Sequence, residues 1–156
     1  MKEIIIDYNV NMETIDKLME DLLKGDNNLA CSAMRDLERL SEGTGAVYAY
    51  FDTFARMLES SKTYVKNRGL ALIGANAKWD TTDKIRGVLD NIIAMLSYEK
   101  PITVRWAVSC LGKIATDKPN LAPAVREALR EADCSMFSES MRPLIEKDIR
   151  KVLGEG

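Results

Sequence analysis

The sequence predicts an all-α protein, a short α-α superhelix of about four antiparallel helix pairs, and three observations carry this prediction. Apolar residues recur with the 3.6-residue period of a helix, and an alternating β pattern is possible only at residues 3–8. Four prolines and nine glycines in 156 residues leave long segments uninterrupted. Residues 62–77 and 100–115 align without gaps at a 38-residue offset, a period typical of paired-helix solenoids.

The periodicity divides the chain into eight helices, paired at roughly 12–41, 46–78, 83–116 and 119–153. The second helix of each pair starts near residue 28, 63, 101 or 138. In the first pair we expect an inner face that includes Leu22, Leu23, Leu29 and Leu37. One pair cannot bury its own apolar stripe, so the pairs are expected to stack into a single domain over residues 1–156.

Turn residues predict where several helices begin. The segment Gly25-Asp26-Asn27 is expected to end the first helix and to cap the second, because short acceptor side chains satisfy the free amides of a first turn. Thr81 or Thr82 is the expected N-cap of the fifth helix. The eighth helix is expected from about Ser138, with Pro143 in its first turns.

Small residues recur at one phase of the second helices, where Gly74 and Gly112 align in the repeat. Glycine inside a helix costs roughly 0.5–1 kcal/mol relative to alanine, so its recurrence predicts close contact between helices. A phosphate-binding loop is excluded, because these glycines fall in mid-helix without a GxxxxGK[ST] context.

The residue inventory removes most catalytic and metal chemistry. The absence of histidine excludes Ser-His-Asp and Cys-His catalysis and His-ligated zinc. Cys31, Cys110 and Cys134 form no CxxC pair, so neither a disulfide framework nor a zinc site is expected. Carboxylate pairs such as Asp16 and Glu20 are typical of a solvated helix face. We expect a protein that is not an enzyme, with no catalytic residues, cofactor or metal.

No apolar run approaches the roughly 18 to 20 residues that a membrane span needs. The run Ile4-Ile5-Ile6 is too short for the core of a signal peptide. We therefore expect a cytoplasmic protein without a membrane partner, and a monomer.

The net charge of −2 is unevenly distributed along the chain. Residues 1–60 hold 12 acids and 6 bases, residues 61–118 hold 5 acids and 10 bases, and residues 119–156 hold 7 acids and 6 bases. The distribution is consistent with solvated helix faces. It is also consistent with a basic central surface that meets an acidic partner or phosphate.

At this point the residues resemble a known family. The segment Val104-Arg-Trp-Ala-Val-Ser-Cys-Leu111 is similar to the Val-Arg-x-x-Ala-x-x-x-Leu pattern of HEAT repeats. The strings at 68–80, 99–103 and 140–149 resemble small bacterial HEAT-repeat proteins often labelled SufBD protein. The resemblance covers most of residues 13–153 and implies a short α-solenoid. The label would imply an accessory role in iron–sulfur assembly, although this chain has no clustered cysteines.

The resemblance also implies where a binding site lies. In HEAT-type stacks the second helices line the concave face, which is the usual binding surface. Asn67 aligns with Arg105 at 38 residues, and Arg105 aligns with Arg142 at 37, which predicts a basic ridge. The candidate binding residues on the second helices are Lys66, Asn67, Arg68, Lys78, Arg105, Trp106, Lys113 and Arg142.

Each of these candidates also has a structural interpretation. In HEAT repeats the arginine near the start of a second helix often pairs with an acid of the adjacent repeat, which would occupy Arg105 and Arg142. Trp79 is expected to pack over the turn that follows its helix. Trp106 is either packed or an exposed anchor of the kind that dominates protein interfaces.

The leading hypothesis for function is a non-enzymatic interaction or scaffold module that binds a protein on the concave face. The alternative is a nucleic-acid-binding protein that uses a basic central groove, although overall acidity opposes the phosphate contacts on which such binding depends. The iron–sulfur accessory role stays a third possibility, and an enzyme is the hypothesis that the residues support least.

Overall fold

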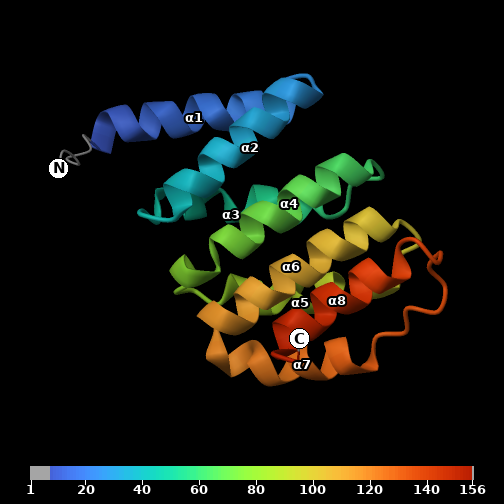
Figure 1. The fold of residues 1–156 in the computed structure, drawn as a ribbon. Coiled ribbons are helices and arrows are strands. Elements are labelled where there is room, and N and C mark those ends of the chain that lie inside the picture. Colours follow the sequence, from blue (N-terminus) through green and yellow to red (C-terminus); the bar gives the residue numbers. More distant parts are fainter. Residues whose placement is uncertain (1–7, 156) are drawn as a thin grey trace.

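A computed structural model describes residues 8–155, and this part of the chain consists of helices and connecting turns, without a β-strand (Figure 1). The all-α prediction is confirmed for these residues. Apart from Tyr8, the possible extended segment at 3–8 lies outside them. The α-helices are α1 (Tyr8–Lys24), α2 (Asn27–Ser41), α3 (Phe51–Met57), α4 (Thr63–Ala75), α5 (Lys84–Ala94), α6 (Pro101–Asp117), α7 (Ala122–Glu131) and α8 (Arg142–Leu153). The 3-10 helices are η1 (Ala46–Tyr50), η2 (Ala77–Trp79), η3 (Met95–Ser97) and η4 (Pro119–Leu121).

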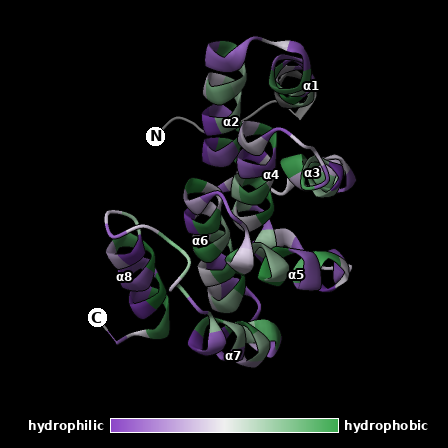
Figure 2. Ribbon diagram, turned by 90° about the vertical axis from the view of Figure 1, so that its right-hand side faces the viewer, coloured by the Kyte–Doolittle hydropathy of each residue, from purple (hydrophilic) through white to green (hydrophobic). Residues whose placement is uncertain are grey.

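The helices lie in two rows, as Figure 2 shows. Helices α2, α4, α6 and α8 form one row, in which each contacts the next. Helices α1, α3, α5 and α7 lie behind them, and each contacts the second helix that follows it. In the described residues the eight α-helices therefore pack as consecutive neighbours in two rows, and we call α1–α2, α3–α4, α5–α6 and α7–α8 the four helix pairs.

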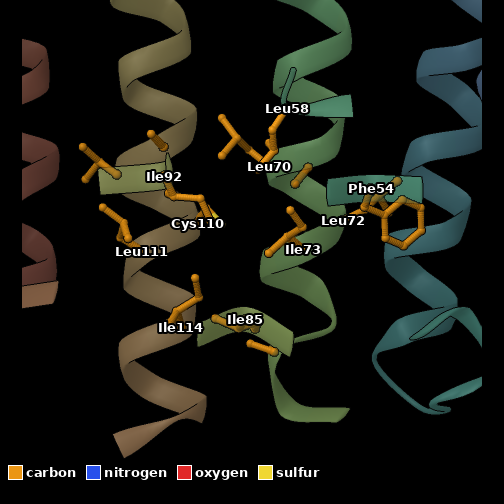
Figure 3. Packing of buried hydrophobic residues seen from close by; sticks show 14 of the residues in the cluster. Phe54, Leu58, Leu70, Leu72, Ile73, Ile85, Ile92, Cys110, Leu111 and Ile114 are labelled. Carbon is orange, nitrogen blue, oxygen red and sulfur yellow. The ribbon is translucent and has the colours of Figure 1, made fainter. Parts of the chain in front are cut away.

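A single apolar core runs through all four pairs, from Ile15 in α1 to Ile149 in α8. Figure 3 shows its centre, where Leu70 and Ile73 of α4 face side chains of the neighbouring helices. Both side chains are 0% exposed, as are Phe54 of α3 and Leu111 of α6. Burying each such side chain contributes about 1.5–3 kcal/mol, so the stacking of pairs is the main source of stability.

The aligned glycines contact the next second helix, which confirms their predicted packing role. A methyl group added at Gly74 of α4 would lie 3.4 Å from Cα of Cys110 in α6. A methyl group at Gly112 of α6 would lie 2.9 Å from a methyl of Val152 in α8. The same helical phase thus meets the next second helix in both cases: a methyl group would clash with Val152 at Gly112 and would make a tight contact with α6 at Gly74.

Two helix starts differ from the predictions. Neither Thr81 nor Thr82 caps α5; the buried carboxylate of Asp80 instead accepts hydrogen bonds from the amides of Lys84 and Ile85, at 2.8 and 3.0 Å. The side chain of Asp26 does cap α2, accepting from the amide of Leu29 at 2.9 Å.

The eighth helix begins at Arg142, four residues later than the expected Ser138. Ser138 forms a turn instead: its carbonyl accepts from the amide of Arg142 at 2.8 Å, and its hydroxyl accepts from the amide of Met141. Pro143 is in the first turn of the helix, as predicted. Pro143 has no N–H to donate to the carbonyl four residues before it, and its ring crowds that carbonyl, which explains why the regular helix starts late.

The inner face predicted for the first pair is partly wrong. Leu22 and Leu37 are buried, but Leu23 is 53% exposed and Leu29 is 46% exposed. In the described residues the first pair has a neighbouring pair on one side only. Its apolar side chains on the opposite side therefore have no helix to pack against and are exposed.

Candidate functional site

A groove of about 890 Å³ runs between α6 and α8 and reaches the start of α7. Gly112 and Val152 both line it, and their contact sets the two helices side by side. Three of the predicted binding residues, Arg105, Trp106 and Lys113, line this groove from α6. We call it the α6–α8 groove; its other polar lining residues are Ser109, Thr116, Asp117, Arg126, Asp148 and Lys151.

Arg105 forms an ion pair across the groove with Asp148 of α8. Its Nε and Nη2 atoms donate to the two carboxylate oxygens at 2.6 and 3.3 Å. The hydrogen bond to Asp148 raises the pKa of Arg105 above its usual value. The predicted pairing of Arg105 with an acid of the adjacent repeat is therefore confirmed. Both side chains are partly exposed, so the pair contributes at most about 1 kcal/mol and mainly orders the groove walls.

Trp106 is half-buried and belongs to both the core and the groove. Part of its side chain packs against the apolar core, and the rest lines the α6–α8 groove. A tryptophan held in this way presents a rigid aromatic surface without losing rotamer freedom on binding. It is the largest apolar side chain that the groove offers.

Lys113 extends across α4 toward α2. Its side chain passes over Gly74, where an added methyl group would lie 3.2 Å from the lysine Cδ. Its Nζ atom lies 4.0 Å from a carboxylate oxygen of Glu38. Burial raises the pKa of Glu38, and although Lys113 and Arg35 lower it, the net shift is upward. The pair is long, and Lys113 keeps 48% of its side chain exposed.

Two predicted cations lie outside the groove and bind groups of the protein itself. The Nζ atom of Lys66 donates to the carbonyl of Leu58 at the end of α3, at 2.7 Å, and lies over the Tyr98 ring. The guanidinium of Arg68, which is 9% exposed, donates to Oδ1 of Asn27 at the start of α2, at 3.1 Å. Both side chains join adjacent pairs of the stack.

Lys78 and Arg142 are also engaged by backbone carbonyls. Lys78 donates to the carbonyl of Glu42 just after α2, at 3.1 Å. Arg142 donates to the carbonyl of Phe137 at 2.8 Å, so the acid of an adjacent repeat expected as its partner is absent among the described residues. This carbonyl belongs to the connector just before α8, so Arg142 binds within its own pair.

Asn67 aligns with Arg105 in the repeat but has no equivalent ion pair. Its Oδ1 atom is buried and has no hydrogen-bond partner among the described residues. The structure therefore separates the predicted basic ridge into internal contacts and one groove. It brings Arg105, Trp106 and Lys113 together and leaves the other five candidates elsewhere.

Sequence reasoning missed the groove residues that come from α7 and α8. Asp148 and Lys151 are the acid and base that face α6, and Arg126 donates to the carbonyl of Leu153 at 3.3 Å. The only available signal was the expectation that Arg105 needs an acid in the next pair. The last helix offers Glu146 and Asp148 for that role, and their order in the sequence does not say which one faces α6.

Trp79 is packed, as predicted, but it packs over the loop after α2 and not over the turn that follows its own helix. Its indole nitrogen donates to the carbonyl of Ser41 at 2.7 Å, and its ring covers Gly45, where an added methyl group would lie 3.1 Å away. This contact caps the end of α2. Trp79 therefore has a structural role, which distinguishes it from Trp106.

The most highly connected charge in the described residues is Asp80, which sequence reasoning did not single out. Its carboxylate, 0% exposed, accepts from Tyr48 at 2.5 Å and lies 3.1 Å from Nζ of Lys118, besides capping α5. Burial raises the pKa of Asp80, but the hydrogen bonds from Tyr48, Ile85, Lys84 and Lys118 outweigh burial and hold the pKa below its usual value. Asp80 thus joins η1, α5 and the segment after α6.

Neither the acids nor the cysteines of the described residues gather into a reactive site. No group of three or more Cys, Asp or Glu side chains is placed to hold a metal ion in residues 8–155. The three cysteines are free and come from different pairs. The chemistry available at the α6–α8 groove is therefore hydrogen bonding, ion pairing and apolar contact.

The Cys110 thiol is expected to resist modification in the folded protein. It is 2% exposed, and burial raises its pKa to about 12, which leaves almost no thiolate at neutral pH. We expect Cys31, which is partly exposed, to react with a thiol reagent before Cys110 does. Mass spectrometry of protein labelled under native and denaturing conditions measures this order, and labelling of Cys110 at the Cys31 rate would contradict the packing of α4 on α6.

No helix in the described part of the chain is long and apolar enough to cross a membrane. Comparisons with protein-family models, with curated proteins and with solved structures gave no match to this chain.

Proposed function

We propose that the protein is a HEAT-like α-solenoid and a non-enzymatic interaction module, which binds a protein partner on the concave face made by its second helices. The stacking of four helix pairs and the contacts between successive second helices support this architecture. A cytoplasmic monomer remains part of the proposal, and the single apolar core that joins all four pairs within one chain is consistent with a monomer.

One observation carries this proposal: the α6–α8 groove combines a half-buried tryptophan with charged side chains at its rim. Tryptophan and arginine are the residues that most often dominate binding energy in protein interfaces. One part of the Trp106 side chain lines the groove, and the rest packs against the core. Its neighbour Arg105 is held in place by the ion pair with Asp148. A rigid anchor of this kind favours a protein segment as the occupant.

The same contacts make nucleic acid the weaker alternative. Phosphate recognition depends on cations that are free to replace counterions. Lys66, Arg68 and Lys78 already donate to carbonyl or amide groups of the protein, and Arg105 is paired with Asp148. An accessory role in iron–sulfur assembly finds no cluster of cysteines among the described residues that would support it.

We expect a Trp106→Ala variant to lose at least tenfold in affinity for the physiological partner, since hot-spot truncations cost about 2 kcal/mol or more. Affinity capture with the wild type and with this variant, followed by quantitative mass spectrometry, identifies the partners that depend on Trp106. Binding of each recovered protein is then measured by titration with purified components. Arg105→Ala is expected to give a smaller loss.

Because Trp106 also contacts the core, a second variant keeps the test decisive. Ser109 is exposed and lines the groove, so Ser109→Tyr fills the groove without removing a core contact. Leu29→Ala, which shortens an exposed leucine on α2, is the matched control. Equal binding by the wild type, Ser109→Tyr and Leu29→Ala would contradict a binding role for the groove.

A further inference from the structure

The α6–α8 groove carries more positive charge than its internal contacts neutralise. Four cations line it, from α6, α7 and α8, against the two acids Asp117 and Asp148. The whole chain has a net charge of −2, so the charge of the groove is opposite in sign to that of the whole chain. This excess selects partners by charge, because complementary potentials steer association and exclude like-charged segments.

The four cations differ in the number and strength of their contacts with other groups of the protein. Arg105 is paired with Asp148, and Arg126 donates to the last carbonyl of α8. Lys151 is exposed, and its ammonium group forms no hydrogen bond or ion pair with another described residue. Lys113 has Glu38 as its partner at 4.0 Å, the outer limit of an ion pair. The two ammonium groups are therefore available to a ligand.

Both of these lysines lie next to the contact between α6 and α8. Gly112 touches Val152, and Lys113 and Lys151 are their immediate neighbours in sequence. Both line the groove, and so does Trp106, two turns earlier in α6. A segment that lies along the groove meets an aromatic surface first and a pair of ammonium groups further on.

In the free protein, Glu38 is the ion-pair partner of one of these ammonium groups, that of Lys113. Its carboxylate is partly buried, and this burial raises its pKa. The single contact to Lys113 at 4.0 Å does not offset the cost of desolvating the carboxylate. Lys113 is half exposed and can turn from α2 toward the groove. An incoming carboxylate that reaches Lys113 therefore competes with Glu38 alone.

We propose, on the basis of the proposed function, that the partner segment is an acidic peptide: it places an apolar side chain on Trp106 and carboxylates on Lys113 and Lys151, displacing Glu38. Carboxylates are favoured over nucleic-acid phosphates because Asp117, Asp148 and Glu38 border the site and repel a continuous phosphate backbone. Isolated carboxylates on a flexible segment avoid these acids.

The test uses the whole chain and a fluorescein-labelled peptide that alternates pairs of glutamate with leucine, read by fluorescence anisotropy. Matched peptides carry glutamine or lysine in place of glutamate, and a labelled DNA duplex is a fourth probe. We expect the glutamate peptide to bind most tightly and its affinity to fall with added salt.

Variants locate the binding. Lys151→Met and Lys113→Met are each expected to weaken the glutamate peptide by about two- to fivefold, the range of a partly exposed ion pair. Glu38→Gln is expected to strengthen it, because Lys113 is then released. Lys147→Met, which removes an exposed lysine of α8 outside the groove, is the control and should change nothing.

The outcomes separate this inference from the proposed function. If the glutamate peptide fails to bind, if the glutamine peptide or the duplex binds as tightly, or if Lys147→Met weakens binding as much as Lys151→Met, the acidic partner is wrong. The proposed function still stands in each of those cases if a purified partner loses affinity with Ser109→Tyr. It falls only when that partner test also fails.

Discussion

Replacing Asp80 with asparagine is expected to lower the free energy of unfolding by about 3 kcal/mol, the loss typical of breaking a buried ion pair. The carboxylate is 0% exposed, lies 3.1 Å from Nζ of Lys118 and accepts two amide hydrogen bonds at the start of α5. Asparagine keeps the shape but removes the charge and turns an amide group toward these donors. Lys118, 14% exposed, would lose its charged partner at 3.1 Å and keep its hydrogen bond to the backbone carbonyl of Asp80 at 2.8 Å and its longer contact to Asp83 at 3.4 Å.

The loss is measured by urea unfolding of the wild type and the variant at neutral pH, with circular dichroism as the signal. Asp52→Asn is the matched control, since Asp52 pairs with Lys84 at 3.0 Å but is 70% exposed. Exposed pairs contribute about 0–1 kcal/mol, so the control should differ little from the wild type. Equal losses in the two variants would show that burial of Asp80 has no energetic consequence.

The effect of Asp80→Asn is also expected to depend on pH. The pKa of Asp80 is lowered in the folded protein, so at acid pH the unfolded chain takes up a proton before the folded chain does. The stabilisation is therefore present above the unfolded value of about 3.9 and is lost as pH falls through the lower folded pKa. Unfolding curves of the variant and the wild type should converge below about pH 4, and a constant difference down to pH 2 would contradict the assigned shift.

Gly69→Ala is expected to destabilise the protein by about 2 kcal/mol, although alanine is the better helix former. A methyl group at this position would lie 2.9 Å from the carbonyl oxygen of Phe54 and 3.0 Å from Cβ of Met57. One of these atoms is backbone, so relief requires that α3 move away from α4. The gain of about 1 kcal/mol in helix propensity does not offset this shift.

Gly87→Ala is the matched control, because Gly87 lies within α5 and no other group comes within 4 Å of an added methyl. There the helix propensity acts alone, and we expect stabilisation by about 0.5–1 kcal/mol. Thermal unfolding of both variants should therefore shift in opposite directions. A rise in Tm for Gly69→Ala would mean that α3 yields easily to α4.

Much of the fold follows from local patterns in the sequence. The 3.6-residue period and the repeat give the eight helices, their pairing and the phase of Gly74 and Gly112. Helix starts are less predictable where a distant side chain supplies the cap. Asp80 replaces Thr81 or Thr82 at the start of α5 because contacts with Tyr48 and Lys118 hold it in place.

The candidate site was predictable on one wall only. Arg105, Trp106 and Lys113 share a helix, so their spacing places them along one side of α6. Asp148 is 43 residues from Arg105, and its position depends on the irregular connector that leads into α8. No local period crosses that connector, so the opposite wall could not be deduced.

The sequence by itself determined the helices of the described residues and the absence of histidine chemistry, because these depend on local periodicity and residue type. Only the tertiary structure decided which cations are available. Lys66 and Lys78 resemble Lys113 and Lys151 in sequence, yet carbonyls at the ends of α3 and α2 bind the first two. Free carbonyls at a helix end need donors, and the donors come from whichever helix the fold places beside them.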